Sequence, residues 1–212
     1  MARSVRPLRR VTAGARDAPH NLYTNLANLR KLSAATRAEP GPLDPAWRFA
    51  PDAPLADRPE GGSISVAYYA NRITYRYHRE TNAYKRSVSG EGSQFDVADD
   101  KRVAPKNVVV MLMRFGPLND GSNKHRLEAD VVGSGVAWIS TNGRTIKGTW
   151  AKTKLTAPTR FFDKDGTPVT LTVGQTFIQV LQTGSTVTIK PGRDPSAATP
   201  APPASAGPSV AP

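Results

Sequence analysis

The sequence of 212 residues is long enough for one domain of ordinary size with appendages. It contains no cysteine, which excludes thiol nucleophiles, thiolate metal sites and disulfides. Its 29 Lys and Arg outnumber 17 Asp and Glu, and the resulting net charge of +12 favours polyanionic partners, although a solubilising surface would show the same balance.

The N-terminal third of the chain predicts little regular structure. Residues 1–19 are rich in Arg and have no hydrophobic period, so we expect a flexible basic arm. Leucines at helical spacing predict one short amphipathic helix from about Asn25 to Ala35, within a segment 20–62 that continues as a Pro-rich connector. We expect Trp47 and Phe49 of this connector to dock onto the domain that follows.

From Ser63 the hydrophobic period changes to two, which predicts a β-rich domain over residues 63–190. Between Arg72 and His78 the alternation places Tyr75 and Tyr77 on an inner face and the arginines on a solvent-exposed face. Further strands are expected at 83–88, 160–162, 175–181 and 186–190. The run 108–113 is apolar on both faces and predicts a central strand covered on both sides.

Asn142-Gly143 between two alternating runs predicts a two-residue type I′ hairpin. That turn would pair Gly135 with Trp150, so that the indole covers a glycine. The Pro- and Ala-rich residues 191–212 predict a disordered tail. The whole pattern predicts a mainly β fold, an antiparallel twisted sheet or sandwich with one short N-terminal helix.

Several segments also resemble a known family. They are residues 18–23, 84–87, 104–110, 130–135, 148–150, 159–166 and 174–178, the last with Phe177 where a Trp is expected. Their order and spacing resemble the C-terminal domain, of unassigned function, of the YerB-like lipoprotein family of Gram-positive bacteria.

The resemblance implies an extracytoplasmic, envelope-associated protein, tethered in relatives by a lipid on an N-terminal cysteine. This chain contains no cysteine, and its basic start leads into no apolar stretch, so we expect a truncated member without signal peptide or lipobox. No apolar run reaches the roughly 18 residues of a membrane-spanning helix. The resemblance supplies no catalytic residues.

Catalytic and metal sites find little support in the residues. The histidines show no ligand spacing, and the run 163–166 is only the first half of a calcium loop, so we expect no metal and no cofactor. His20 and Asn21 begin the helical segment, where we favour a local turn at Asn21 and packing or capping by His20 over a binding role. Asp130 with His20 would be the pair of a hydrolase, but no further acid is singled out as a partner.

We therefore interpret the chain as a non-catalytic, extracytoplasmic binding or scaffolding module of the cell envelope. Its partner would be an anionic wall polymer or an envelope protein, met through the basic sheet face, with Arg72, Arg76, Arg79 and Arg160 as contacts. A non-specific nucleic-acid-binding protein remains an alternative, although inward tyrosines disfavour a stacking platform. A hydrolase with an unrecognised site is the third hypothesis.

Overall fold

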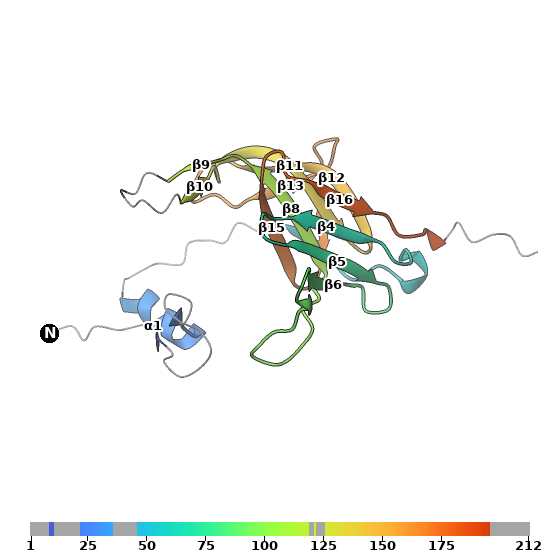
Figure 1. Ribbon diagram of the computed structural model, residues 1–212, viewed down its shortest axis with the longest axis horizontal. Coiled ribbons are helices and arrows are strands. Elements are labelled where there is room, and N and C mark those ends of the chain that lie inside the picture. The colour runs from blue at the N-terminus through green and yellow to red at the C-terminus, as the bar shows by residue number, and fades with distance from the viewer. Residues whose placement is uncertain (1–8, 11–21, 36–45, 119–120, 122–125, 196–212) are drawn as a thin grey trace, which may run out of the picture. The chain divides into compact units, whose positions relative to one another are not determined.

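The computed structural model describes residues 9–10, 22–35, 46–118, 121 and 126–195 (Figure 1). The chain divides into two compact units, Met1–Asp44 and Pro45–Pro212. Most of the predicted arm and most of the predicted tail lie outside the described residues.

The first unit contains the predicted helix. Strand β1 (Arg9–Arg10) pairs antiparallel with β2 (Leu22–Tyr23), and α1 (Leu26–Ala35) follows. Asn25 caps the helix, because its side-chain oxygen accepts a hydrogen bond from the backbone N–H of Asn28 at 2.9 Å. None of the helix residues is buried, and Leu26 is 72% exposed, so the expected apolar face has no cover among the described residues.

The second unit contains two five-stranded sheets. The β5 sheet has the strand order β16–β4–β5–β6–β7, with bounds Val187–Lys190, Ser63–Ala67, Arg72–His78, Ala83–Val88 and Gly92–Ser93. The β8 sheet has the order β13–β12–β11–β8–β15, with bounds Arg160–Phe162, Arg144–Lys152, Gly133–Thr141, Asn107–Met113 and Thr176–Gln182. Two short pairs, β3 (Arg48–Ala50) with β14 (Thr170–Thr172) and β9 (Phe115–Pro117) with β10 (Leu127–Ala129), and a 3₁₀ turn at Leu55–Asp57 complete the unit.

The predicted fold class, mainly β with one short helix, is confirmed. Most neighbouring strands run antiparallel, as expected, but β15 pairs parallel with β8 and β14 pairs parallel with β3. A parallel partner requires the chain to cross over, and here the crossover from β8 to β15 contains β9 to β14. The Pro-rich connector also supplies β3, a strand that its composition did not predict.

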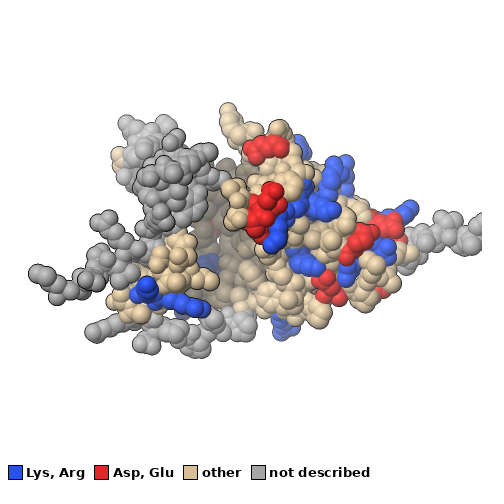
Figure 2. Space-filling model, turned by 90° about the horizontal axis from the view of Figure 1, so that it is seen from below, with Lys and Arg blue, Asp and Glu red and all other residues tan. Residues whose placement is uncertain are grey.

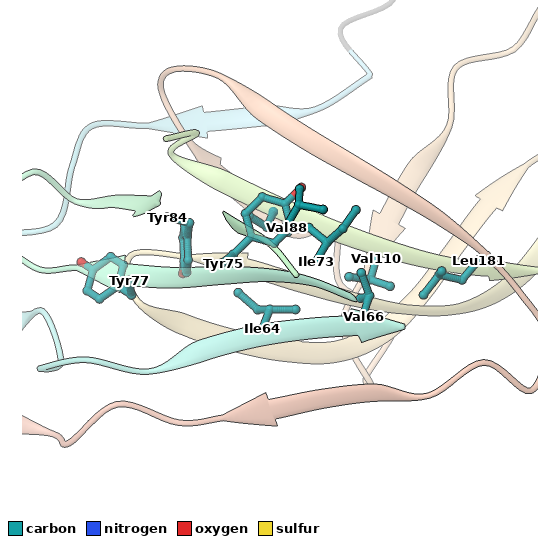
Figure 3. Packing of buried hydrophobic residues seen from close by; sticks show 10 residues of the cluster. Ile64, Val66, Ile73, Tyr75, Tyr77, Tyr84, Val88, Val110 and Leu181 are labelled. Carbon is teal, nitrogen blue, oxygen red and sulfur yellow. The ribbon is translucent and has the colours of Figure 1, made fainter. Parts of the chain in front are cut away.

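The two sheets pack face to face around one hydrophobic core (Figure 3). Ile64, Val66 and Tyr75 of the β5 sheet meet Val110 and Leu181 of the β8 sheet there, and all five are at most 2% exposed. The alternation of β5 turns its tyrosines inward, as predicted. Burial of this apolar surface is the main stabilising contribution to the contact between the sheets.

The opposite face of the β8 sheet carries a second core. Strand β8 sends Val110 into the first core and its neighbours Val109 and Met111 into the second, which confirms the prediction of a strand covered on both sides. Trp47 covers this core, because it stacks on Phe161 with ring centroids 5.5 Å apart and donates from Nε1 to the Thr159 carbonyl at 2.8 Å. The expected docking is therefore confirmed for Trp47.

The β11–β12 hairpin has the predicted register. Asn142 and Gly143 both take positive φ, 49° and 76°, as a type I′ turn requires. Gly135 pairs with Trp150 across the hairpin, as expected. Gly148 faces the backbone of β13 so closely that a Cβ there would lie 1.9 Å from the Phe162 carbonyl oxygen.

Candidate binding surface

The outer face of the β5 sheet carries the arginines that the sequence pattern turned outward. Along β5, Arg72 and Arg76 are exposed, Thr74 between them is half-buried, and the residues between these are buried in the core. The alternation of a strand with one covered face produces this separation. The same strand therefore supplies core tyrosines and outward cations.

Strand pairing extends this surface across the sheet. Arg76 lies opposite Ser63 on β4 and Lys85 on β6, and Ser63 lies opposite Lys190 on β16. Paired residues on neighbouring strands point to the same side at a spacing of about 5 Å. Arg76, Lys85 and Lys190 thus form one row with a serine among them.

The adjacent row consists of hydroxyl side chains. In strand order it contains Thr188, Ser65, Thr74, Ser87 and Ser93, one from each strand of the sheet. Ser65 and Thr74 share a hydrogen bond with 3.1 Å between their oxygens, and Arg102 donates to Ser87 at 3.1 Å. We call this hydroxyl row, together with Arg72, Arg76, Lys85 and Lys190, the basic face.

The cations of the basic face have no acidic partner within the part of the chain that the structure describes. The ion pairs there involve other basic residues, and Arg72, Arg76, Lys85 and Lys190 are not among them. An unpaired surface cation keeps its full attraction for an external anion. Figure 2 shows lysine and arginine side chains next to acidic ones, so the two signs of charge are mixed on the face drawn there.

Two of the predicted contact arginines lie elsewhere. Arg79 donates to the backbone carbonyls of Arg58 at 3.0 Å and Leu55 at 2.8 Å, so its guanidinium fastens the 3₁₀ turn to the sheet. Arg160 is exposed on β13, in the β8 sheet rather than the β5 sheet. The structure does not bring either of them into the rows around Arg76.

Of the remaining predicted site residues, the structure describes only Asp130. His20 and Asn21 lie outside the described residues. Asp130 is half exposed and pairs with Arg114, whose Nε donates to its carboxylate at 2.6 Å. Among the described residues no three His, Asp or Glu side chains group as metal ligands. The 163–166 segment is a turn in which the Asp163 carboxylate accepts from the Thr167 amide at 2.9 Å.

Sequence reasoning missed Lys85 and Lys190 as members of the basic face. On β6, Lys85 lies between Tyr84 and Arg86, which are both buried. Because Lys85 and Arg86 are both basic, the alternation of residue types did not show which of the two points outward. Arg86 is 8% exposed, lies 5.1 Å from the Phe177 ring centroid and donates to the Tyr75 hydroxyl at 3.2 Å. The buried guanidinium of Arg86 is thus surrounded by aromatic faces and a hydroxyl oxygen, where a carboxylate would be the usual partner.

Comparison with known proteins agrees with this architecture. The family model described as protein of unknown function (DUF3048), C-terminal domain, matches residues 64–178. The crystal structure of YerB protein from Bacillus subtilis superposes with a TM-score of 0.65 at 18% identity over 86% of this chain. The chain spans 59% of that YerB chain. No curated protein matches the sequence. No described helix is both long and apolar enough to span a membrane.

Proposed function

The chain belongs to the DUF3048 family through its C-terminal domain, and from that premise we propose that it is a non-catalytic module that binds an anionic polymer of the cell envelope through the basic face. The carrying observation is the set of unpaired cations around Arg76 beside a row of hydroxyls. The extracytoplasmic setting rests on the resemblance of the sequence to YerB-like lipoproteins.

The geometry suits an extended polymer with regularly spaced anionic groups. Phosphodiester or carboxylate groups would meet the row of Arg76, Lys85 and Lys190, while sugar or glycerol hydroxyls would exchange hydrogen bonds with the Ser and Thr row. An open sheet face does not enclose a small ligand, but it can contact a polymer chain across several strands. Charged contacts at an exposed surface favour binding of a broad class of anionic polymers over binding of one specific polymer.

Sedimentation with purified Gram-positive cell walls tests the proposal. The protein should pellet with walls that retain their phosphodiester-linked polymers and stay in solution with walls stripped of them by hydrofluoric acid. The double variant R72E/R76E should lose most of this binding. K154E/K164E is the matched control, because it makes the same charge change beside strands of the β8 sheet.

Equal pelleting of R72E/R76E and the control would refute a role for the basic face. Equal pelleting with intact and stripped walls would refute the anionic polymer as the ligand. Tighter binding of the protein to a single-stranded oligonucleotide than to the wall polymer would favour the nucleic-acid alternative.

A further inference from the structure

Strand β15 forms an open edge of the β8 sheet. It pairs with β8 on one side, and none of the strands that the structure describes pairs with its other side. Figure 1 shows it at the border of the sheet. Its seven residues make it the longest edge strand of the two five-stranded sheets, since β16 has four, β13 three and β7 two. An edge strand of this length presents a row of backbone groups to which another strand can bind.

The pairing with β8 turns the backbone groups of every second residue of β15 outward. The Gln175 carbonyl accepts from the first amide of β8 at 3.1 Å, so the odd-numbered residues face β8. The amides of Ile178 and Val180 therefore point away from the sheet, and within the described part of the chain neither has an acceptor. The Val180 carbonyl lies 3.3 Å from the Tyr68 hydroxyl, but that hydroxyl donates to Gln179 at 2.5 Å.

The residue types of β15 do not discourage pairing with another chain. Edge strands of soluble proteins are commonly protected by charged side chains, by proline or by being very short. β16 contains Lys190 and β13 contains Arg160, whereas β15 has no charged residue and no proline. A neutral strand can lie beside a copy of itself without like-charge repulsion. The sequence of β15 thus permits a second copy of the chain as its partner.

The side chains of Ile178 and Val180 are complementary in such a pair. Each is 36% exposed on the face of the second core, beside Val109 and Met111 of β8. In an antiparallel pair of β15 strands centred on Gln179, Ile178 of each copy lies opposite Val180 of the other. The outward amides and carbonyls of these residues then face one another as hydrogen-bonded pairs. Two β-branched side chains at each pair would bury surface that the single chain leaves exposed.

We propose that the protein forms a two-fold symmetric dimer by antiparallel pairing of β15 with β15 of a second copy. The pairing joins two β8 sheets into one continuous sheet. The two-fold axis of such a pair is perpendicular to the sheet, so both β5 sheets lie on the same side of it. Both basic faces then point in the same direction, where one polymer can contact both; this consequence, unlike the dimer, rests on the proposed function. A single strand pair buries little surface, so the dimer should dissociate on dilution.

Analytical ultracentrifugation of the full chain tests the proposal between about 1 µM and about 1 mM, the range of weak association. The wild type should change from monomer to dimer within this range. Ile178→Lys/Val180→Lys should weaken the dimer at least about tenfold, because it places lysines opposite one another. Leu155→Lys/Thr156→Lys is the matched control, because it makes the same charge change at exposed positions between β12 and β13 and should leave the dimer affinity unchanged. Equal association of the two variants would overturn the proposal.

Amide hydrogen exchange gives a second measurement, which needs no variant. The outward amides of Ile178 and Val180 should exchange quickly in dilute protein and more slowly as the concentration rises. Those of Phe177 and Gln179 should stay protected by β8 throughout. Protection of the outward amides at every concentration would show that the chain covers its own edge, and would overturn the second copy as the occupant. A wild type that is monomeric at about 1 mM, with both amides unprotected, would leave the edge to a different protein and equally overturn the dimer.

Discussion

The indole of Trp150 occupies the space that a side chain at Gly135 would need. A Cβ at Gly135 would lie 2.7 Å from the indole Nε1 and 2.5 Å from the Leu112 carbonyl oxygen, and that Nε1 donates to the same carbonyl at 2.7 Å. Trp150 is 2% exposed. The aromatic ring over a glycine therefore links β12, β11 and β8 at one point of the second core.

Replacing Gly135 with alanine should destabilise the domain. The added methyl group has to displace either the indole or the backbone of β8, which costs roughly 1–3 kcal/mol for overpacking in a core. Urea unfolding followed by tryptophan fluorescence would measure the loss. Gly116→Ala is the matched control, because a Cβ there meets no atom within 4 Å and should cost little. Equal effects of the two changes would contradict the contact.

Asn142 stabilises the hairpin turn through its backbone conformation and a polar network through its side chain. It has a φ of 49°, and its side-chain oxygen accepts from Asn82 Nδ2 at 2.7 Å and from the Ala53 amide at 3.1 Å. Asn142→Ala should cost about 2–4 kcal/mol, because it adds backbone strain to two lost hydrogen bonds. Asn142→Gly relieves the strain and should recover part of this loss. Chemical denaturation of both variants would test the order, which the reverse ranking would contradict.

The sequence predicted what depends on local pattern. The alternation around Tyr75 and the turn at Asn142 determine facing and register over a few residues, and both were confirmed. The parallel pairing of β15 with β8 and the short β3–β14 pair depend on contacts between distant segments, which no local period encodes.

The residues of the candidate site also divide into those that a local pattern predicts and those that only the folded structure brings in. Arg72 and Arg76 followed from alternation within one strand. Lys190 could join them only through the register of β16 against β4, and Arg79 left the set because its acceptors belong to the folded connector.

Asp52 should make the stability of the domain depend on pH. The Lys106 ammonium, 2.7 Å away, holds the pKa of this carboxyl below its ordinary value of 3.8, and Arg58 adds to the effect. Because the folded-state pKa is the lower one, the ionised carboxylate stabilises the fold above the unfolded-state pKa. That stabilisation is lost as the pH falls through the folded-state pKa.

The measurable consequence is a gap between wild type and Asp52→Asn in the free energy of unfolding. The gap should be largest near pH 7 and should narrow as the pH falls below about 4. Asp99→Asn is the comparison: Lys101 also holds the pKa of Asp99 below its ordinary value, but this pair is exposed and screened by solvent, so its gap should be smaller. A gap for Asp52→Asn that stays constant with pH would contradict the linkage.

Binding of polyanions to the basic face should be almost purely electrostatic. Tyr75 is fully buried, so it is not available to stack on bases, and the contacts of this face are cations and hydroxyls. Affinity for polyphosphate and for a single-stranded oligonucleotide should therefore fall with similar slopes as salt rises, and R72Q/R76Q should reduce both slopes. Fluorescence anisotropy between 50 and 500 mM salt, roughly the range over which screening becomes strong, would measure this. Oligonucleotide binding that persists at the highest salt would instead reveal stacking on an aromatic surface and favour the nucleic-acid alternative.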